Sequence, residues 1–153
     1  VIEEAIPFIK HKTGWFGPMM ATGCSMGGYH SLNIFLQHPD VFGKVIALSG
    51  VYDARFFVGE YGNDELIFRN SPSDNIWMQN DGWFIDHYRA ADIIVCTGLG
   101  PWEQDGLPSF YSLKKAFEEK NIPAWFDVWG EDVAHDWPWW RIQMPYFLEK
   151  LNL

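Results

Sequence analysis

The chain has 153 residues, of which 48% are apolar, so it can form one domain with a sizeable core. Its net charge of −9 argues against nucleic acid and anionic membrane surfaces as partners, since both require a basic face. No apolar run approaches the ~18 residues of a membrane span, and we find no signal-peptide pattern.

The first third of the chain alternates between helical and strand patterns. Residues 1–12 have a helical pattern, and residues 18–22 are short and apolar, as a buried strand is. Apolar residues at helical spacing follow until His38-Pro39 closes the run. Residues 44–48 form the second predicted strand, so the order is helix, strand, helix, strand.

The middle of the chain, about residues 51–91, is predicted to be an irregular excursion, because glycine and proline recur in it. A long insertion after a core strand is typical of a cap or a substrate-facing segment. Regular patterns then return as a strand at 92–97, a helix at 107–120, a strand at 124–129 and a helix from about Pro138, in which Pro145 should cause a kink.

This alternation predicts an α/β fold, with a mostly parallel sheet and helices on both faces. We expect residues 1–153 to form a single domain of this kind. The pattern contains no internal repeat and no low-complexity segment that would divide it.

The segment Gly23-Cys24-Ser25-Met26-Gly27-Gly28 lies between the first predicted strand and the helix after it. A serine at the centre of G-x-S-x-G in this setting is typical of the nucleophile elbow of an α/β-hydrolase. The serine then stands on a strained turn, where glycines two positions before and after it avoid backbone clashes. Ser25 is the predicted nucleophile, and the N–H of Met26 is the predicted oxyanion donor.

An α/β-hydrolase normally has several strands before the elbow, including one whose following loop supplies half of the oxyanion hole. The elbow strand follows Val1 closely in this chain. We therefore expect a fragment with the C-terminal part of the fold, and a second oxyanion donor located before Val1.

A serine hydroxyl needs a base, and the base needs a carboxylate that orients it. In this fold the base follows the last strand, and His135 has that position, five residues after Gly130. The other histidines lie on predicted helices, at a helix end or in the excursion, and are expected to have surface or packing roles: His11, His30, His38 and His87.

The acid is expected on the loop after the third strand, which offers two carboxylates. Glu103 comes first and is preferred, while Asp105 is an alternative that also suits a turn. Asp53, after the second strand, is a third candidate, because some triads take their acid from that strand. Asp136 is expected to cap the last helix.

Three segments have the sequences G-C-S-M-G-G at 23–28, A-L-S-G-V-Y-D at 47–53 and H-D-W-P-W-W-R at 135–141. Together they resemble the Putative esterase family of α/β-hydrolases, the group with esterase D-like and antigen 85-like enzymes. The resemblance covers nearly the whole chain and implies Ser25 as nucleophile and His135 as base. The acid of that family usually stands as G-x-x-D, and Gly100-Pro101-Trp102-Glu103 has this spacing with glutamate in place of aspartate.

These features predict a serine carboxylic-ester hydrolase that forms an acyl-enzyme with a small-molecule ester. The alternatives are an acyltransferase to an alcohol or sugar acceptor, and a non-catalytic binding domain of the same fold. Trp102 and Trp137 flank the predicted catalytic loops and are candidates for substrate binding, although large aromatic residues more often belong to a core.

No His or Cys group has metal-ligand spacing, and no glycine loop has a phosphate-binding pattern. We therefore expect no metal and no cofactor. Cys24 and Cys96 form no disulfide framework and are expected to be buried thiols, which suits the cytoplasm. The oligomeric state stays open.

Overall fold

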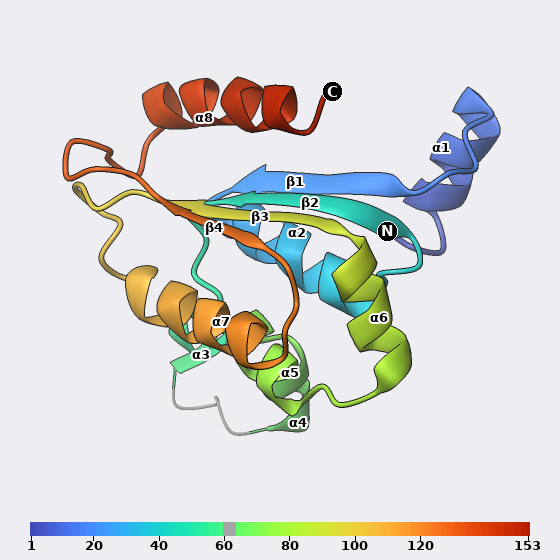
Figure 1. The fold of residues 1–153 in the computed structure, drawn as a ribbon, viewed down its shortest axis with the longest axis horizontal. Helices are drawn as coiled ribbons and strands as arrows, with labels where there is room; N and C mark the ends of the chain where they lie inside the picture. The colour runs from blue at the N-terminus through green and yellow to red at the C-terminus, as the bar shows by residue number, and fades with distance from the viewer. Residues whose placement is uncertain (60–63) are drawn as a thin grey trace.

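Four parallel strands form the central sheet, in the order β1-β2-β3-β4 (Figure 1). The computed structural model describes residues 1–59 and 64–153. The strands are β1 (Met19–Cys24), β2 (Phe42–Leu48), β3 (Asp92–Thr97) and β4 (Trp125–Val128). The predicted parallel α/β sheet is confirmed, and every strand lies within two residues of its predicted bounds.

Helices cover both faces of the sheet, as predicted. One face carries α2 (Met26–Gln37), α6 (Gly82–Ala90) and α7 (Leu107–Glu119), and the other carries α8 (Trp137–Lys150) (Figure 1). The first helix, α1 (Ala5–Thr13), lies beyond the end of the sheet and begins four residues later than expected. Helix α8 runs through Pro145 as one helix.

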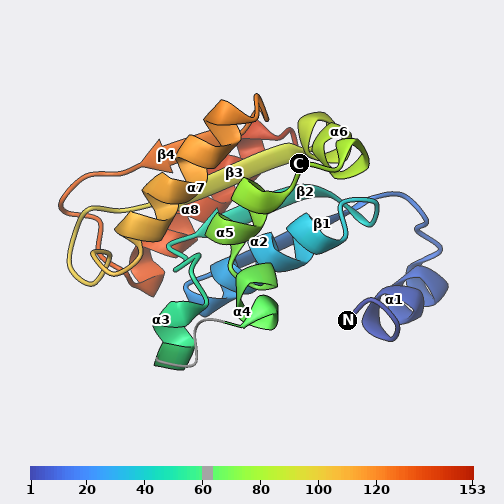
Figure 2. The ribbon, with the colours of Figure 1, turned by 90° about the horizontal axis from the view of Figure 1, so that it is seen from below.

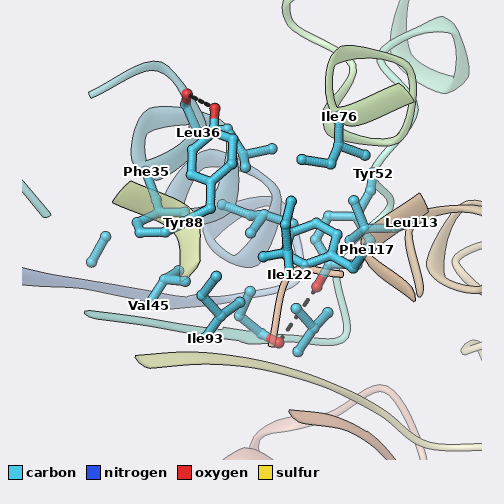
Figure 3. Packing of buried hydrophobic residues seen from close by; sticks show 14 of the residues in the cluster. Phe35, Leu36, Val45, Tyr52, Ile76, Tyr88, Ile93, Leu113, Phe117 and Ile122 are labelled. Carbon is cyan, nitrogen blue, oxygen red and sulfur yellow. Dashed lines mark hydrogen bonds between the residues drawn. The ribbon is translucent and has the colours of Figure 1, made fainter. Parts of the chain in front are cut away.

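The core has two parts because β2 and β3 are buried on both faces. Val45 and Ile93 are paired neighbours that pack toward α2, α6 and α7, while Ile46 and Ile94 pack toward α8. Successive strand residues point to opposite faces. Because both faces are buried, residues 45–48 of β2 and 93–96 of β3 are continuous apolar runs. Figure 3 shows the larger cluster, in which the buried Tyr88 hydroxyl donates to the Leu36 carbonyl oxygen at 2.5 Å.

The prediction for residues 51–91 was wrong in one respect, because the described residues of this segment, 51–59 and 64–91, contain four short helices. They are α3 (Arg55–Val58), α4 (Glu65–Arg69), α5 (Pro72–Met78) and α6. Pro72 and Gly82, which were interpreted as breakers, lie in the first turns of α5 and α6 instead. The Asp64 and Asp81 side chains accept from backbone N–H groups at the starts of α4 and α6. Figure 2 shows α5 between α2 and α7, with Ile76 buried there.

The structure also bears on the two cysteines and on membrane-spanning helices. Cys96 is a buried free thiol, as predicted, whereas Cys24 is only partly buried because it lies at the exposed end of β1. Within residues 1–59 and 64–153, no helix has both the length and the apolar character that crossing a membrane requires.

Candidate active site

Ser25 is the single residue between the end of β1 and the start of α2. Its φ of 56° and ψ of −123° are strained for a residue with a side chain, as the elbow pattern predicts. Its N–H donates to the carbonyl oxygen of Leu48 at 2.8 Å, so the strained turn is anchored to the neighbouring strand. The turn lies at the carboxyl end of the sheet, where ligands of open α/β sheets bind.

The glycines around Ser25 leave room for this turn. A Cβ on Gly23 would lie 2.4 Å from the Gly27 backbone, and a Cβ on Gly28 would lie 2.7 Å from the Leu48 carbonyl oxygen. Neither contact is possible for a larger residue without movement of the backbone. The same expectation for Gly27, two positions after Ser25, was wrong, because a Cβ there would meet nothing within 4 Å.

His135 lies between Ser25 and Glu103, although the three residues come from different loops. Its Nε2 is 2.8 Å from Ser25 Oγ, and its Nδ1 is 3.4 Å from Glu103 Oε2. Glu103 is 2% exposed, whereas the His135 side chain is 22% exposed. The arrangement has a hydroxyl, an imidazole and a carboxylate in the order that nucleophilic catalysis requires.

The loops that hold Glu103 and His135 are joined by backbone hydrogen bonds. The Gly100 N–H donates to Val133 O at 3.0 Å, and the His135 N–H donates to Pro101 O at 2.9 Å. A Cβ on Gly100 would lie 2.6 Å from Val133 O, so the absence of a side chain allows this close approach. The relative position of acid and base is thus set by main-chain contacts between two loops that follow neighbouring strands.

Two further side chains contact Glu103, a third contacts one of these two, and sequence reasoning assigned none of the three to the acid. Ser49 Oγ donates to Glu103 Oε1 at 2.6 Å, and Thr97 Oγ1 lies 3.2 Å from Glu103 Oε2. The indole Nε1 of Trp140 donates to Ser49 Oγ at 3.0 Å. The one signal in the sequence is position. Ser49 directly follows β2 and Thr97 ends β3, and candidate site residues of this fold lie at the carboxyl ends of strands.

The alternative carboxylates, Asp53 and Asp105, make no hydrogen bond with His135 in the described part of the chain. Asp53 binds the Arg55 side chain at 2.8 Å, and Arg55 also reaches Asp74 at 2.9 Å. Asp105 lines the same cavity as Ser25, but only Glu103 is within hydrogen-bond range of His135 in the described part of the chain. Asp136 accepts from the Trp137 N–H at 2.7 Å, which confirms its predicted place as the cap of α8.

The remaining histidines make no contact with Ser25 among the hydrogen bonds of the described residues. His11 lies in α1, His30 in α2, and His38 ends α2. His87 lies in α6, where its Nδ1 is 2.7 Å from the Trp83 carbonyl oxygen. Cys24 is an alternative nucleophile beside Ser25, but burial raises the pKa of its thiol, so it stays protonated at neutral pH.

A cavity of about 160 Å³ opens over Ser25 and His135. Its lining includes Met26 of the elbow and the aromatic residues Phe56, Phe57 and Trp102. Trp102 is 83% exposed, with a φ of 70°. Trp137 is not among the described residues that line the cavity. Its ring packs edge-on against Trp140, with centroids 5.2 Å apart.

A larger hollow of about 620 Å³ lies between α2, α4, α5 and α6. Its lining includes His38 and Glu65 but neither Ser25 nor His135. Size alone therefore does not mark the site. The smaller cavity is the candidate active site, because it holds the hydroxyl, the imidazole and the carboxylate together.

A family model described as Putative esterase matches residues 1–151. The chain belongs to the Putative esterase family. Solved structures agree on the fold. A ferulic acid esterase has a TM-score of 0.75 at 23% identity, over 95% of this chain and 56% of that one.

Two other structures similar to this Putative esterase chain have equally high scores. An S-formylglutathione hydrolase from Agrobacterium tumefaciens has a TM-score of 0.74 at 16% identity, over 97% of this chain and 54% of that one. MPT51 of Mycobacterium tuberculosis has a TM-score of 0.74 at 14% identity, over 97% of this chain and 65% of that one. The chain thus has the α/β-hydrolase fold and spans about half to two thirds of these proteins. No curated protein sequence matches it.

Proposed function

We propose that this chain holds the catalytic residues of a serine carboxylic-ester hydrolase, with Ser25 as nucleophile, His135 as base and Glu103 as acid. The observation that carries the proposal is the 2.8 Å distance between His135 Nε2 and Ser25 Oγ, with the other ring nitrogen facing Glu103. Membership of the Putative esterase family supports the same chemistry.

In the proposed reaction, Ser25 Oγ attacks the ester carbonyl carbon while His135 Nε2 takes the hydroxyl proton. The tetrahedral intermediate collapses when the bond to the alcohol oxygen breaks and His135 returns the proton to that oxygen. Water then attacks the acyl-enzyme in the same way and releases the acid and free Ser25. Glu103 accepts from His135 Nδ1 and so keeps Nε2 free to receive the proton.

The N–H of Met26 is the proposed donor to the oxyanion. Met26 is the first residue of α2, so its N–H has no carbonyl partner within that helix. The N-terminus of α2 also has a partial positive charge, which favours a developing negative charge on the carbonyl oxygen. Both effects act at the Met26 N–H. This group lies beside the position that the ester carbonyl oxygen must take when Ser25 attacks.

The volume of the cavity suits a small acyl or alcohol group. Its volume of about 160 Å³ is close to the ~150 Å³ of an apolar cavity that binds benzene. Phe56, Phe57 and the exposed Trp102 offer apolar and aromatic surface to such a group. We assign Trp102 a substrate-binding role, whereas the lining of the cavity offers no support for Trp137.

We also propose that residues 1–153 act as one α/β-hydrolase domain and that the protein is located in the cytoplasm. The free thiols of Cys24 and Cys96 are the support for the location, because such thiols persist in reducing compartments. Cell fractionation with an antibody to the chain tests the location.

A fluorophosphonate probe tests the function, because it labels a serine only when a neighbouring base activates it. The expected result is one adduct in the intact mass, mapped to the peptide with Ser25, and absent after Ser25→Ala. The matched variant His135→Ala keeps the hydroxyl and should label at least ~10²-fold more slowly. An adduct on another residue, or ester hydrolysis unchanged by Ser25→Ala, contradicts the proposal.

Transfer of the acyl group to an alcohol or sugar is the alternative outcome of the same acyl-enzyme. Product analysis with a chromogenic ester, with and without an added alcohol or sugar, separates the two reactions. Free acid as the main product supports hydrolysis. A new ester that grows with the acceptor concentration indicates acyl transfer instead.

A further inference from the structure

Ser49 has a backbone conformation that a serine adopts only at a cost. It follows β2 directly, is 3% exposed and has a φ of 52°. Glycine adopts a positive φ without strain, whereas a residue with a Cβ does not. A buried serine in this conformation indicates that its hydroxyl, which glycine lacks, has a use.

The direction of the hydrogen bonds around Ser49 follows from the groups involved. The indole N–H of Trp140 is a donor only, so the 3.0 Å contact occupies a lone pair on Ser49 Oγ. The single hydroxyl proton of Ser49 is then left for Glu103 Oε1 at 2.6 Å. That distance is typical of a hydroxyl that donates to an ionised carboxylate.

Ser49 binds the carboxylate oxygen that does not face the base. Glu103 Oε1 accepts from Ser49, while Oε2 lies 3.4 Å from His135 Nδ1. Fixing one oxygen fixes the rotation of the planar carboxylate, and this rotation decides whether the second oxygen meets the imidazole. Thr97 is a weaker constraint, because its one proton is shared between Glu103 at 3.2 Å and the Gly98 carbonyl at 3.3 Å.

Trp140 connects this acid support to the base. Its indole N–H donates to Ser49, and its ring lies edge-on to the His135 imidazole, with centroids 5.1 Å apart and planes at 85°. Trp140 is 7% exposed and lies in α8, on the opposite face of the sheet from α2. One residue of α8 therefore contacts both the base and the hydroxyl that holds the acid.

We propose that Ser49 is a positioning residue whose hydroxyl, oriented by the Trp140 indole, holds the Glu103 carboxylate toward His135. Ser49 acts through Glu103 and touches neither Ser25 nor His135 in the hydrogen bonds of the described residues. This inference rests on the proposed ester hydrolysis. It predicts that the effect of Ser49 on turnover exists only while Glu103 is a carboxylate.

A double-mutant cycle on kcat and KM for p-nitrophenyl acetate tests this dependence. Ser49→Ala is expected to lower kcat about tenfold, the effect of losing one hydrogen bond to a charged group. KM should stay within about twofold, because Ser49 borders the cavity but is only 3% exposed, so it offers the substrate little surface. In the Glu103→Gln background, Ser49→Ala should change kcat by less than about twofold.

Matched variants separate positioning from a general loss of stability. Ser71→Ala removes another fully buried hydroxyl, which accepts from the Ala54 N–H at 2.9 Å, and should leave kcat unchanged. Trp140→Phe removes only the donor to Ser49 and should lower kcat about threefold, again only with Glu103 present. Trp129→Phe removes an indole donor to Asp127 at 2.9 Å and serves as its control. If Ser49→Ala does not fold, Trp140→Phe and its control Trp129→Phe provide the same test.

The outcomes distinguish this inference from the proposed function. An equal kcat loss from Ser49→Ala with and without Glu103, or an equal loss from Ser71→Ala, overturns the positioning role alone. If the unsubstituted chain hydrolyses no ester, or Ser25→Ala changes nothing, the proposed function is wrong and this inference fails with it.

Discussion

The backbone N–H of His135 donates to the carbonyl oxygen of Pro101 at 2.9 Å, which joins the loop after β4 to the loop after β3. Pro101 stands two residues before Glu103, so this bond places the two loops side by side where acid and base must meet. The bond is between main-chain atoms and does not depend on either side chain. Substitutions of Glu103 or His135 therefore change chemistry more than loop position, and they are suited to functional tests.

Glu103→Gln is expected to lower kcat about 10³-fold, because a neutral amide no longer stabilises a protonated His135 or holds its tautomer. Asp105→Asn and Asp53→Asn should lower kcat less than about threefold, since neither carboxylate is within hydrogen-bond range of His135. Initial rates with p-nitrophenyl acetate measure all three. A larger loss from Asp53→Asn than from Glu103→Gln would show that the acid assignment is wrong.

Gly28→Ala is expected to lower the free energy of unfolding by about 2 kcal/mol, because its Cβ would lie 2.7 Å from the Leu48 carbonyl oxygen. Gly27→Ala is the matched control on the next residue. Its Cβ meets nothing within 4 Å, so the better helix former should raise stability by ~0.5–1 kcal/mol. Urea unfolding measures both, and the same sign for both variants would contradict the packing argument.

Arg55→Met is expected to destabilise the fold at neutral pH and much less in acid. Burial raises the pKa of Asp53, but hydrogen bonds from Arg55 and its charge outweigh burial and leave that pKa below its ordinary value. Such a lowered pKa contributes stability above the unfolded pKa of ~3.9, and this stability is lost as the pH falls through the folded pKa. Burial raises the pKa of Asp74, so Asp74 also relies on Arg55 at neutral pH.

The Arg55→Met effect should be about 1 kcal/mol at pH 7, since the Arg55 side chain is 39% exposed and solvent screens it. Thermal unfolding at pH 7 and at pH 2, below the lowered pKa of Asp53, measures the difference. Lys114→Met breaks a looser surface pair with Glu118 at 3.9 Å and should change stability by less than ~0.3 kcal/mol at either pH. An Arg55→Met effect that is independent of pH would exclude the carboxylates as its cause.

Trp102→Ala is expected to raise KM about fivefold with little change in kcat, because an exposed ring over the cavity binds substrate without taking part in proton transfer. Trp102→Gly should raise KM equally but be more stable than Trp102→Ala by ~1 kcal/mol, since φ is 70° at this position. Trp83→Ala, which removes a half-exposed ring on α6, is the control for KM. Unchanged KM in Trp102→Ala would remove its binding role.

Local patterns predict β2 and β3 well because these two strands are buried on both faces. The predicted strand 92–97 matches β3 residue for residue, since no polar position interrupts its apolar run after Asp92. Residues 51–91 were harder, because Asp64, Pro72 and Asp81 occur both in loops and at helix starts. Their meaning depends on whether the following residues find a core, as Ile76 and Tyr88 do.

The order of residues along the chain predicted which side chains would meet at the site, and the structure brings Ser25, His135 and Glu103 together as expected. Their catalytic roles stay predictions. The support around Glu103 could not be predicted, because Ser49 is 54 residues from Glu103 and 91 from Trp140. Only tertiary packing shows that a serine at a strand end and a tryptophan of the last helix share one hydroxyl.

The helix α3, in the segment between β2 and β3, forms part of the cavity wall. These strands pair directly, with Val45 opposite Ile93 and Leu48 opposite Cys96, so their register does not depend on the helices inserted between them. Phe56 and Phe57 of the cavity wall belong to this insertion, whereas Ser25, Glu103 and His135 do not. An exchange of α3 alone would therefore alter the wall that meets the ester, and would keep Ser49 beside Glu103 and the core residues Ile76 and Tyr88.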